Sequence, residues 1–305
     1  MINEKGNNKD LVMDRSNKGK SVMANCLALC NEITMGIHYV QAAILLYNTV
    51  FLSTVIFNCQ AWTNLTKEDE KKLLTVQLSY LKRILRSPQS TSNCFVFLEM
   101  GILPIIFIIH TRQLSFLHHI LNLEPDDPVR RLYNEQLSLP YEKNWGNTTQ
   151  KLLMKYELQH LNPISMSKLS WKQTVKEHVA DFAFRELLKE AKDKSKTNHL
   201  NYSKLTPQPY IFKLHPKAAS TVFKLRSRNI ECKANRKSNT TDLSCRLCQT
   251  EEETQEHIVN CPGILEDNES EVDIEPVMVR DVDVESDSSL VMEICRRISL
   301  FHDKI

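Results

Sequence analysis

The chain has 305 residues, a formal net charge of +2, and 42% hydrophobic against 25% charged residues, a composition typical of a globular protein with a buried core. Its 6 glycines and 11 prolines are few, which favours long helices over many short strands. The nine cysteines are an odd number and no charged-then-apolar leader precedes them, which argues against a secreted disulfide framework. We therefore expect a mostly α, intracellular protein with reduced thiols.

The first part of the chain predicts a polar lead-in followed by buried helices. Residues 1–20 are rich in Asn and Lys and lack apolar periodicity, so we expect them to be disordered. Residues 33–66 contain no Asp, Glu, Lys or Arg, which raises the question of a membrane span. The best window, residues 42–57, is shorter than the roughly 20 apolar residues that a span needs. Core helices are the favoured interpretation, and a membrane protein is the weaker alternative.

Three later stretches carry clear helix signals. Thr66 is an N-cap candidate before an acidic first turn, and leucines recur at helical spacing from there to residue 86. Prolines begin the helices expected at residues 104–121 and 127–140, where Asp127 is the cap of the second. A further helix is expected over residues 170–192. These stretches predict a helical bundle-like domain.

Charge is unevenly distributed toward the C-terminus. Residues 204–237 contain nine basic side chains opposed only by Glu231, whereas residues 266–287 contain ten acidic ones opposed only by Arg280. Clustered Lys and Arg bind phosphate backbones, so the basic block and its expected helix at residues 218–230 predict RNA or DNA as the partner. A basic helix that only keeps the domain soluble is the alternative. The candidate nucleic-acid contacts are Lys213, Lys217, Lys224, Arg226, Arg228, Lys233, Arg236 and Lys237.

Four residues between these two blocks have the spacing of a zinc knuckle. Cys245 and Cys248 form a Cys-x2-Cys pair, and after eight residues His257 and Cys261 form a His-x3-Cys pair. A tight turn places the first two sulfurs together, and one helical turn places the other two ligands on one face. Residues 250–256 suit a helix that leads into His257. Four protein ligands close a tetrahedral site, so we expect a structural Zn²⁺, and four unrelated buried residues are the alternative.

No enzyme signature is present. The chain has no Walker-type glycine loop, no Gly-x-Ser-x-Gly elbow and no His-Glu-x-x-His. Its one adjacent aspartate pair, Asp126 and Asp127, stands where a helix is expected to begin, so capping explains it. We predict no catalytic residue and no small-molecule substrate.

Several segments resemble a known family. Residues 61–69 (Ala-Trp-Thr-Asn-Leu-Thr-Lys-Glu-Asp) and 81–85 (Leu-Lys-Arg-Ile-Leu), continued by 98–104 and 112–121, resemble the helical region that follows the polymerase palm in non-LTR (LINE-like) retrotransposon reverse transcriptases. The four knuckle residues are similar to the C-terminal CCHC knuckle of the same proteins. The resemblance implies a thumb-like helical region that helps to hold template RNA or target DNA. The Tyr/Phe-x-Asp-Asp motif of the family's palm does not occur in these 305 residues, so no polymerisation is expected.

The sequence thus suggests a chain of contiguous segments with one favoured function. The segments are a disordered lead-in (1–20), a thumb-like helical domain (21–140), a basic helical region (141–238), the zinc knuckle (239–263) and an acidic tail with a terminal helix (264–305). The favoured function is a non-catalytic nucleic-acid-binding remnant of such a reverse transcriptase. The alternative is a zinc-stabilised protein-interaction module in which the acidic tail and the terminal helix make the contacts.

Overall fold

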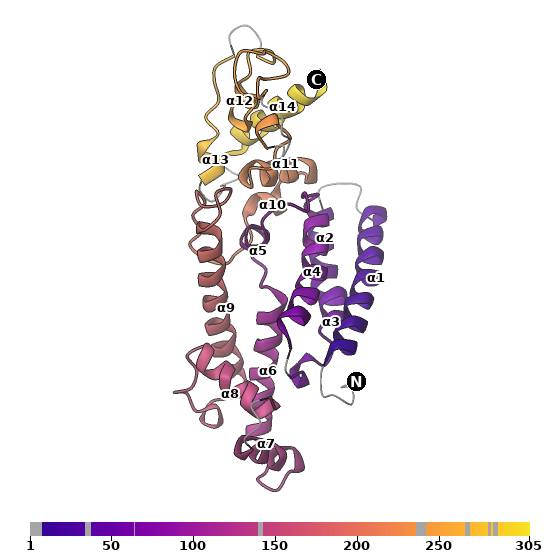
Figure 1. Cartoon of the computed structure of the whole chain (residues 1–305), viewed down its shortest axis with the longest axis vertical. Coiled ribbons are helices and arrows are strands. Elements are labelled where there is room, and N and C mark those ends of the chain that lie inside the picture. The colour runs from indigo at the N-terminus through magenta and orange to yellow at the C-terminus, as the bar shows by residue number, and fades with distance from the viewer. Residues whose placement is uncertain are drawn as a thin grey trace. The chain divides into compact units, whose positions relative to one another are not determined.

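The computed structural model is mostly helical, as the sequence predicts (Figure 1). It describes residues 8–33, 38–63, 65–139, 143–235, 242–265, 269–279, 282 and 286–305. Within those ranges there is no β-strand, only one isolated bridge between Ser244 and Glu252. The contacts divide the chain into a first unit and a second unit that do not follow the contiguous segments suggested by the sequence. The first unit comprises Met1–Leu29, Ile44–Tyr80 and Leu103–Glu186, and the second comprises Cys30–Ala43, Leu81–Ile102 and Leu187–Ile305.

The stretch expected to be disordered is largely helical. Helix α1 runs over Lys9–Ile33, and only residues 1–7 of the expected lead-in lie outside the described part of the chain. Val12, Ser16 and Gly19 are buried at helical spacing along one face of α1. A Cβ atom at Gly19 would lie 2.7 Å from Val55 Cγ2 and 3.0 Å from Val76 Cγ1. For residues 8–20 the prediction of disorder was wrong, because this face packs through small side chains, which an apolar pattern does not reveal.

The uncharged stretch forms core helices; its part up to Ala43 belongs to the second unit, and its part from Ile44 belongs to the first. It contains α2 (Tyr39–Leu46), the π-helix η1 (Tyr47–Phe51), α3 (Leu52–Val55) and the 3-10 turn η2 (Cys59–Ala61), and it leads to α4 (Lys67–Ile84). The ring of Phe51 lies 4.8 Å from that of Tyr80 and 5.5 Å from that of Tyr47, centroid to centroid. Thr66 caps α4 as expected, because its hydroxyl accepts from the amide of Asp69 at 3.2 Å. Apolar packing and a capped helix therefore account for this stretch.

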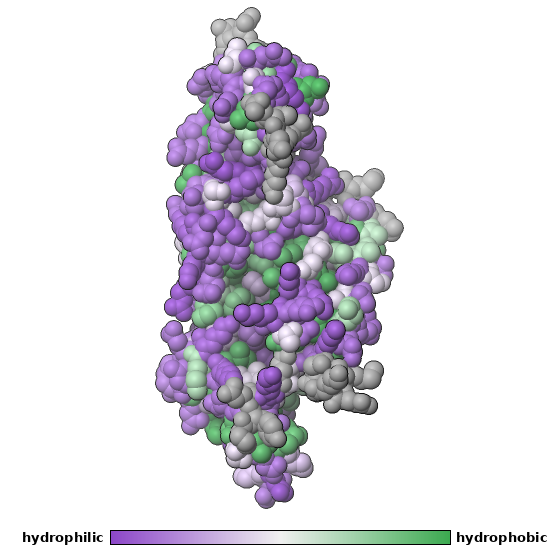
Figure 2. Space-filling model, in the orientation of Figure 1, coloured by the Kyte–Doolittle hydropathy of each residue, from purple (hydrophilic) through white to green (hydrophobic). Residues whose placement is uncertain are grey.

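The remainder of the first unit packs around α6 (Ile105–Leu121). Helices α7 (Pro128–Ser138) and α8 (Trp145–Lys155), the turn η3 (Pro163–Ser165) and the first part of α9 (Lys168–Lys192) surround it. The Trp171 indole is fully buried and donates to the carbonyl of Leu114 at 2.8 Å. Asp127 caps α7, as the sequence predicts. Figure 2 shows hydrophobic surface over α7, where Val129 and Leu132 are 47% and 54% exposed.

The second unit gathers most of the C-terminal helices. These are α5 (Asn93–Met100), α10 (Pro209–Lys213), α11 (Pro216–Arg226), η4 (Lys233–Asn235), α12 (Gln255–Asn260), α13 (Glu275–Val279) and α14 (Ser288–Lys304). Helix α11 packs against α10, α13 and α14, and α12 packs against α14. This packing surrounds α11 and places α12, which carries a knuckle ligand, against the terminal helix.

Side chains of α12 and α14 hold the described part of the acidic tail. The Asn260 side chain exchanges two hydrogen bonds with the backbone of Val272, at 2.8 and 2.9 Å. The buried Arg297 side chain donates to the Ser270 carbonyl at 2.9 Å. Residues 266–268, 280–281 and 283–285 lie outside the described residues. Polar side chains of α12 and α14 therefore fix this acidic segment, and the expected terminal helix is present as α14.

Among the described helices, none alone is both long enough and apolar enough to cross a membrane. The consecutive helices α5 and α6 satisfy that criterion only when they are taken together, and the chain bends sharply between them.

Candidate metal centre and basic surface

Short-range hydrogen bonds build the two arms of the knuckle. The first arm is a turn in which the Gln249 amide donates to the Cys245 carbonyl at 3.0 Å, and Gln249 adopts a left-handed conformation with φ 58°. The amide of Cys245 donates to the Glu251 carbonyl at 2.7 Å, which folds the chain back. The second arm is α12, whose cap is Thr254: the Thr254 hydroxyl accepts from the His257 amide at 3.1 Å. The helix expected over residues 250–256 therefore begins only at Gln255, because the preceding residues form the return of the turn.

The four candidate ligands converge, as their spacing predicts. Their ligand atoms all lie within 4.8 Å of one another. The sulfurs of Cys245 and Cys261 are 3.7 Å apart, and the Cys248 sulfur is 3.3 Å from His257 Nε2. Cys245, His257 and Cys261 are buried, and Cys248 is partly exposed. This cluster could hold a metal ion.

Neighbouring polar groups orient the ligands. His257 Nδ1 lies 3.0 Å from a carboxylate oxygen of Glu251, which directs Nε2 toward the thiols. The Thr250 hydroxyl donates to the Cys248 sulfur at 3.1 Å. Burial opposes the ionisation of Cys248, but hydrogen bonds from Thr250 and the Glu251 amide lower its pKa to about 6. Burial and the neighbouring thiols raise the pKa of Cys261 to about 12. A bound cation would offset the repulsion that opposes the last ionisation.

Gly263 allows the segment after Cys261 to pack closely against the first arm of the knuckle. A Cβ atom at Gly263 would lie 2.6 Å from Leu247 Cγ and 2.8 Å from its Cδ2. Leu247 belongs to the turn between the first two cysteines, so the absence of a side chain at Gly263 lets the two arms approach each other.

A buried carboxylate connects the knuckle to the basic segment. The Glu253 side chain is 0% exposed and accepts two hydrogen bonds from the Arg246 guanidinium, at 2.8 and 2.9 Å. It also accepts from the Lys233 amide at 3.0 Å. Burial alone would raise the pKa of Glu253, but the hydrogen bonds from Arg246 hold it below its usual value. Sequence reasoning missed this residue, because one buried glutamate cannot be recognised within an acidic run.

Three of the predicted basic contacts that are not buried lie on α11 or just beyond its end. Lys217 and Lys224 lie seven residues apart on α11, which keeps both on one side of the helix, and Arg228 follows beyond the end of α11 in a left-handed conformation with φ 51°. Lys217 and Arg228 are exposed, Lys224 is half-buried, and none of the three makes an ion pair with another described residue. We call Lys217, Lys224 and Arg228 the basic stripe. Lys213 is also exposed, at the end of α10.

Arg226 does not belong to that surface, although the sequence predicts it as a contact. Its guanidinium is fully buried and donates to Glu99 from Nε at 3.0 Å and from Nη2 at 2.9 Å. Its Nη1 donates to the Val277 carbonyl at 2.7 Å. The same carboxylate accepts from the hydroxyls of Tyr202 and Tyr210. A phosphate cannot reach Arg226, and its place among Val222, Phe223 and Leu225 was the signal for a buried position.

The remaining predicted contacts are distributed differently. The Lys233 ammonium is 3.0 Å from the Asp242 carboxylate, so its charge is already paired. Arg236 and Lys237 lie outside the described residues. The basic stripe, with Lys213 beside it, is therefore the part of the predicted set that the structure presents to solvent.

No family model, curated protein or solved structure matches this chain. The likeness to non-LTR reverse transcriptases therefore rests on the residues quoted above. The function proposed below is argued from the knuckle and the stripe.

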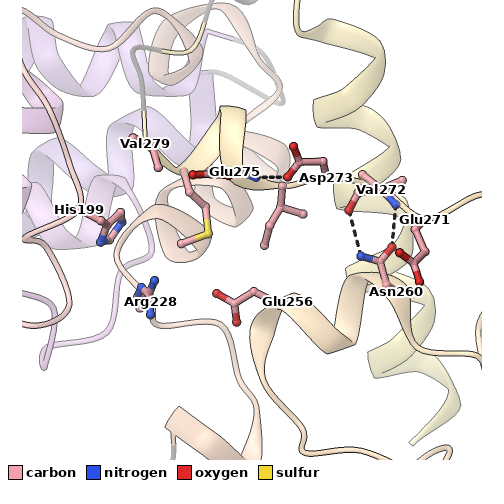
Figure 3. A pocket seen from close by; sticks show the side chains of 11 residues that line it. His199, Arg228, Glu256, Asn260, Glu271, Val272, Asp273, Glu275 and Val279 are labelled. Atoms are coloured by element: carbon pink, nitrogen blue, oxygen red, sulfur yellow. Dashed lines mark hydrogen bonds between the residues drawn. The ribbon is translucent and has the colours of Figure 1, made fainter.

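An acidic cavity of 720 Å³ borders the Arg228 end of the stripe (Figure 3). Glu256 extends into it from α12, and Glu271, Asp273 and Glu275 line it from the tail segment. His199 lines the same cavity, and burial together with the nearby arginines holds the pKa of this imidazole below its usual value. The stripe therefore ends against acidic side chains.

Proposed function

We propose that this chain is a non-catalytic nucleic-acid-binding module in which a structural Zn²⁺ stabilises the fold beside a phosphate-binding helix. The observation that carries the proposal is that one unit combines four converging ligands with a basic stripe that makes no ion pair with another described residue. The resemblance to reverse transcriptases suggests that template RNA or target DNA is the ligand and that the module is a remnant of such a protein. Thiol ligation of a metal fits an intracellular environment that keeps cysteines reduced.

The donor set and its spacing suit zinc. Zinc forms bonds of about 2.3 Å to sulfur and about 2.0 Å to nitrogen, so the edges of its tetrahedron are about 3.5–3.8 Å. The distance of 3.7 Å between the sulfurs of Cys245 and Cys261 matches such an edge, and the distance of 3.3 Å from the Cys248 sulfur to His257 Nε2 is slightly shorter than one. Three thiolates and one imidazole complete four-coordination and leave no position for a substrate. Zn²⁺ in this site would serve folding and not catalysis.

The basic stripe has the reach and charge to follow a phosphate backbone. From Lys217 to Lys224 the helix advances seven residues, which corresponds to about 10 Å at the helical rise, and Arg228 follows just beyond the end of α11. Three neutralised phosphates give an expected slope of log affinity against log salt of about −2.1 for a single strand and about −2.7 for a duplex. Binding through this stripe would be independent of sequence, because it contacts only the backbone.

The alternative of a tail-mediated protein-interaction module is less favoured. Helix α14 buries Val291, Ile294 and Phe301, and it packs against α11 and α12. Its apolar face is thus already used within the second unit. A partner would have to displace these contacts before it could bind that face.

The test is a salt titration on the full chain loaded with Zn²⁺. Fluorescence anisotropy with labelled RNA and DNA oligonucleotides should detect binding at low salt that weakens as salt rises. Lys217→Ala and Lys224→Ala should each lower the affinity and flatten the slope by about 0.7–0.9. Lys172→Ala is the control, because Lys172 is exposed as Lys217 is but lies on α9 in the first unit. Absence of binding at low salt, or equal effects of all three variants, would reject the proposal.

A further inference from the structure

A groove between α11 and α14 adjoins the basic stripe. It encloses a cavity of 540 Å³ at the N-terminal end of α11. His215, Lys217 and Ala218 line it from the α11 side, and Met292, Ile298 and His302 line it from α14. Lys217 belongs to both the stripe and the groove, so a chain that follows the stripe reaches the groove.

The groove combines an apolar surface with planar rings. Met292 is 57% exposed and lies with Ala218 and Ile298 in the lining. Burial holds the pKa of His302 below its usual value, so this imidazole is neutral at pH 7. Nucleobases that are not paired stack on neutral planar side chains and contact apolar ones. The lining therefore has the chemistry that an unpaired base requires.

The charged residues that line the groove favour a phosphate at one end and an uncharged base at the other. Arg296 also lines it, but this guanidinium is bound to Glu269 and Glu293, at 2.6 and 2.8 Å. The Asp303 carboxylate lies next to His302 and disfavours a phosphate there. Lys217 is then the cation left for a phosphate, and the part of the groove near His302 suits an uncharged group.

The opposite end of the stripe restricts the path of a bound strand. Beyond Arg228, Glu256 and Glu271 line the acidic cavity, so like charge repels a phosphate backbone from that side. A strand on the stripe is consequently directed past Lys217 and toward the groove. A duplex on the same stripe could fill the groove only after a base had been extruded, which costs a few kcal/mol.

We infer that the stripe and the groove together bind a single-stranded nucleic acid, with phosphates on Lys217, Lys224 and Arg228 and one unpaired base between α11 and α14. This inference deepens the proposed function and rests on it. RNA and DNA single strands share the required chemistry, and a preference for one of them would indicate a contact with the ribose hydroxyl.

The experiment measures the anisotropy of labelled oligouridylate, oligodeoxythymidylate and a duplex of equal length with the full, Zn²⁺-loaded chain. Wild type should bind the single strands more tightly than the duplex. His302→Ala should weaken single-strand binding about five- to tenfold and leave both duplex binding and the salt slope unchanged, because a base contact releases no counterions. Ala218→Leu, which fills the groove, should act in the same way.

Two controls make the outcomes distinct. His119→Ala removes an equally planar, exposed ring from α6 in the first unit and should change nothing. Circular dichroism melts should show that His302→Ala and Ala218→Leu remain folded. Equal affinity for single strand and duplex, with no effect of His302→Ala, would overturn the groove while Lys224→Ala could still support the stripe. Loss of all binding in wild type would overturn both.

Discussion

The structure predicts that Arg226 stabilises the fold and does not contact nucleic acid. Arg226→Met would leave the Glu99 carboxylate, which is 0% exposed, with only the hydroxyls of Tyr202 and Tyr210 as donors. Burial and the Glu99 charge hold the pKa values of both tyrosines well above their usual range, so they remain donors. Removing one partner of a buried ion pair costs about 3–5 kcal/mol, because the other charge stays buried without compensation.

Urea unfolding followed by far-UV circular dichroism measures this cost. Arg226→Met should lower the free energy of unfolding by about 3–5 kcal/mol. The double variant Glu99→Gln with Arg226→Met should cost less than Arg226→Met alone, because it buries no unpaired charge. Without urea, at a temperature where Arg226→Met is folded, the slope of log affinity against log salt for nucleic-acid binding should equal that of wild type. An unfolding midpoint equal to that of wild type, or a slope as flat as that of Lys224→Ala, would refute this role.

Three further outcomes follow from the structure. Atomic absorption should find one Zn²⁺ per chain. Cys261→Ser should abolish zinc binding and lower the urea midpoint of unfolding. Cys295→Ser, which alters a cysteine outside the cluster, should do neither. Gly19→Ala should cost about 1–3 kcal/mol because its methyl group meets Val55 at 2.7 Å, although Asn17→Ala on the exposed face of α1 should be neutral or stabilising. Hydrogen bonds from Arg296 lower the pKa of Glu293 to about 2, so its contribution is present above the ordinary carboxyl pKa of about 4.3 and is lost as the pH falls toward 2. The stability difference between wild type and Glu293→Gln should therefore close over that window, and a constant difference would contradict the ion pair.

Local signals account for what the sequence predicted well. The four metal-ligand candidates are separated by short, regular spacings, so a turn and one helical turn suffice to bring them together. Thr66 and Asp127 marked helix starts because capping depends on neighbouring residues only. Features set within a few residues were thus readable from the sequence.

Long-range packing accounts for the errors. Arg226 seemed to be a surface contact because its counter-ion, Glu99, is 127 residues away in the chain. Gly19 and Ser16 gave no apolar signal, yet they form the buried face of α1 because larger residues of other helices fill the space beside them. The backbone of the acidic tail is held by Asn260 and Arg297, which lie 12 and 27 residues from the groups that they bind. Composition and periodicity cannot report partners of this kind.

The position of Glu99 in the sequence also determines which fragments of this protein can be studied in isolation. A C-terminal fragment that begins at Leu187 would retain the four knuckle residues, the stripe and the groove. It would lack Glu99, however, and would have to bury the Arg226 guanidinium without a counter-ion. Such a fragment would not represent the intact protein, because α11 would lose the ion pair between Arg226 and Glu99. The second unit is built from stretches that are separated in the sequence. Residues 81–102 must therefore be included with the C-terminal part in any attempt to isolate this unit.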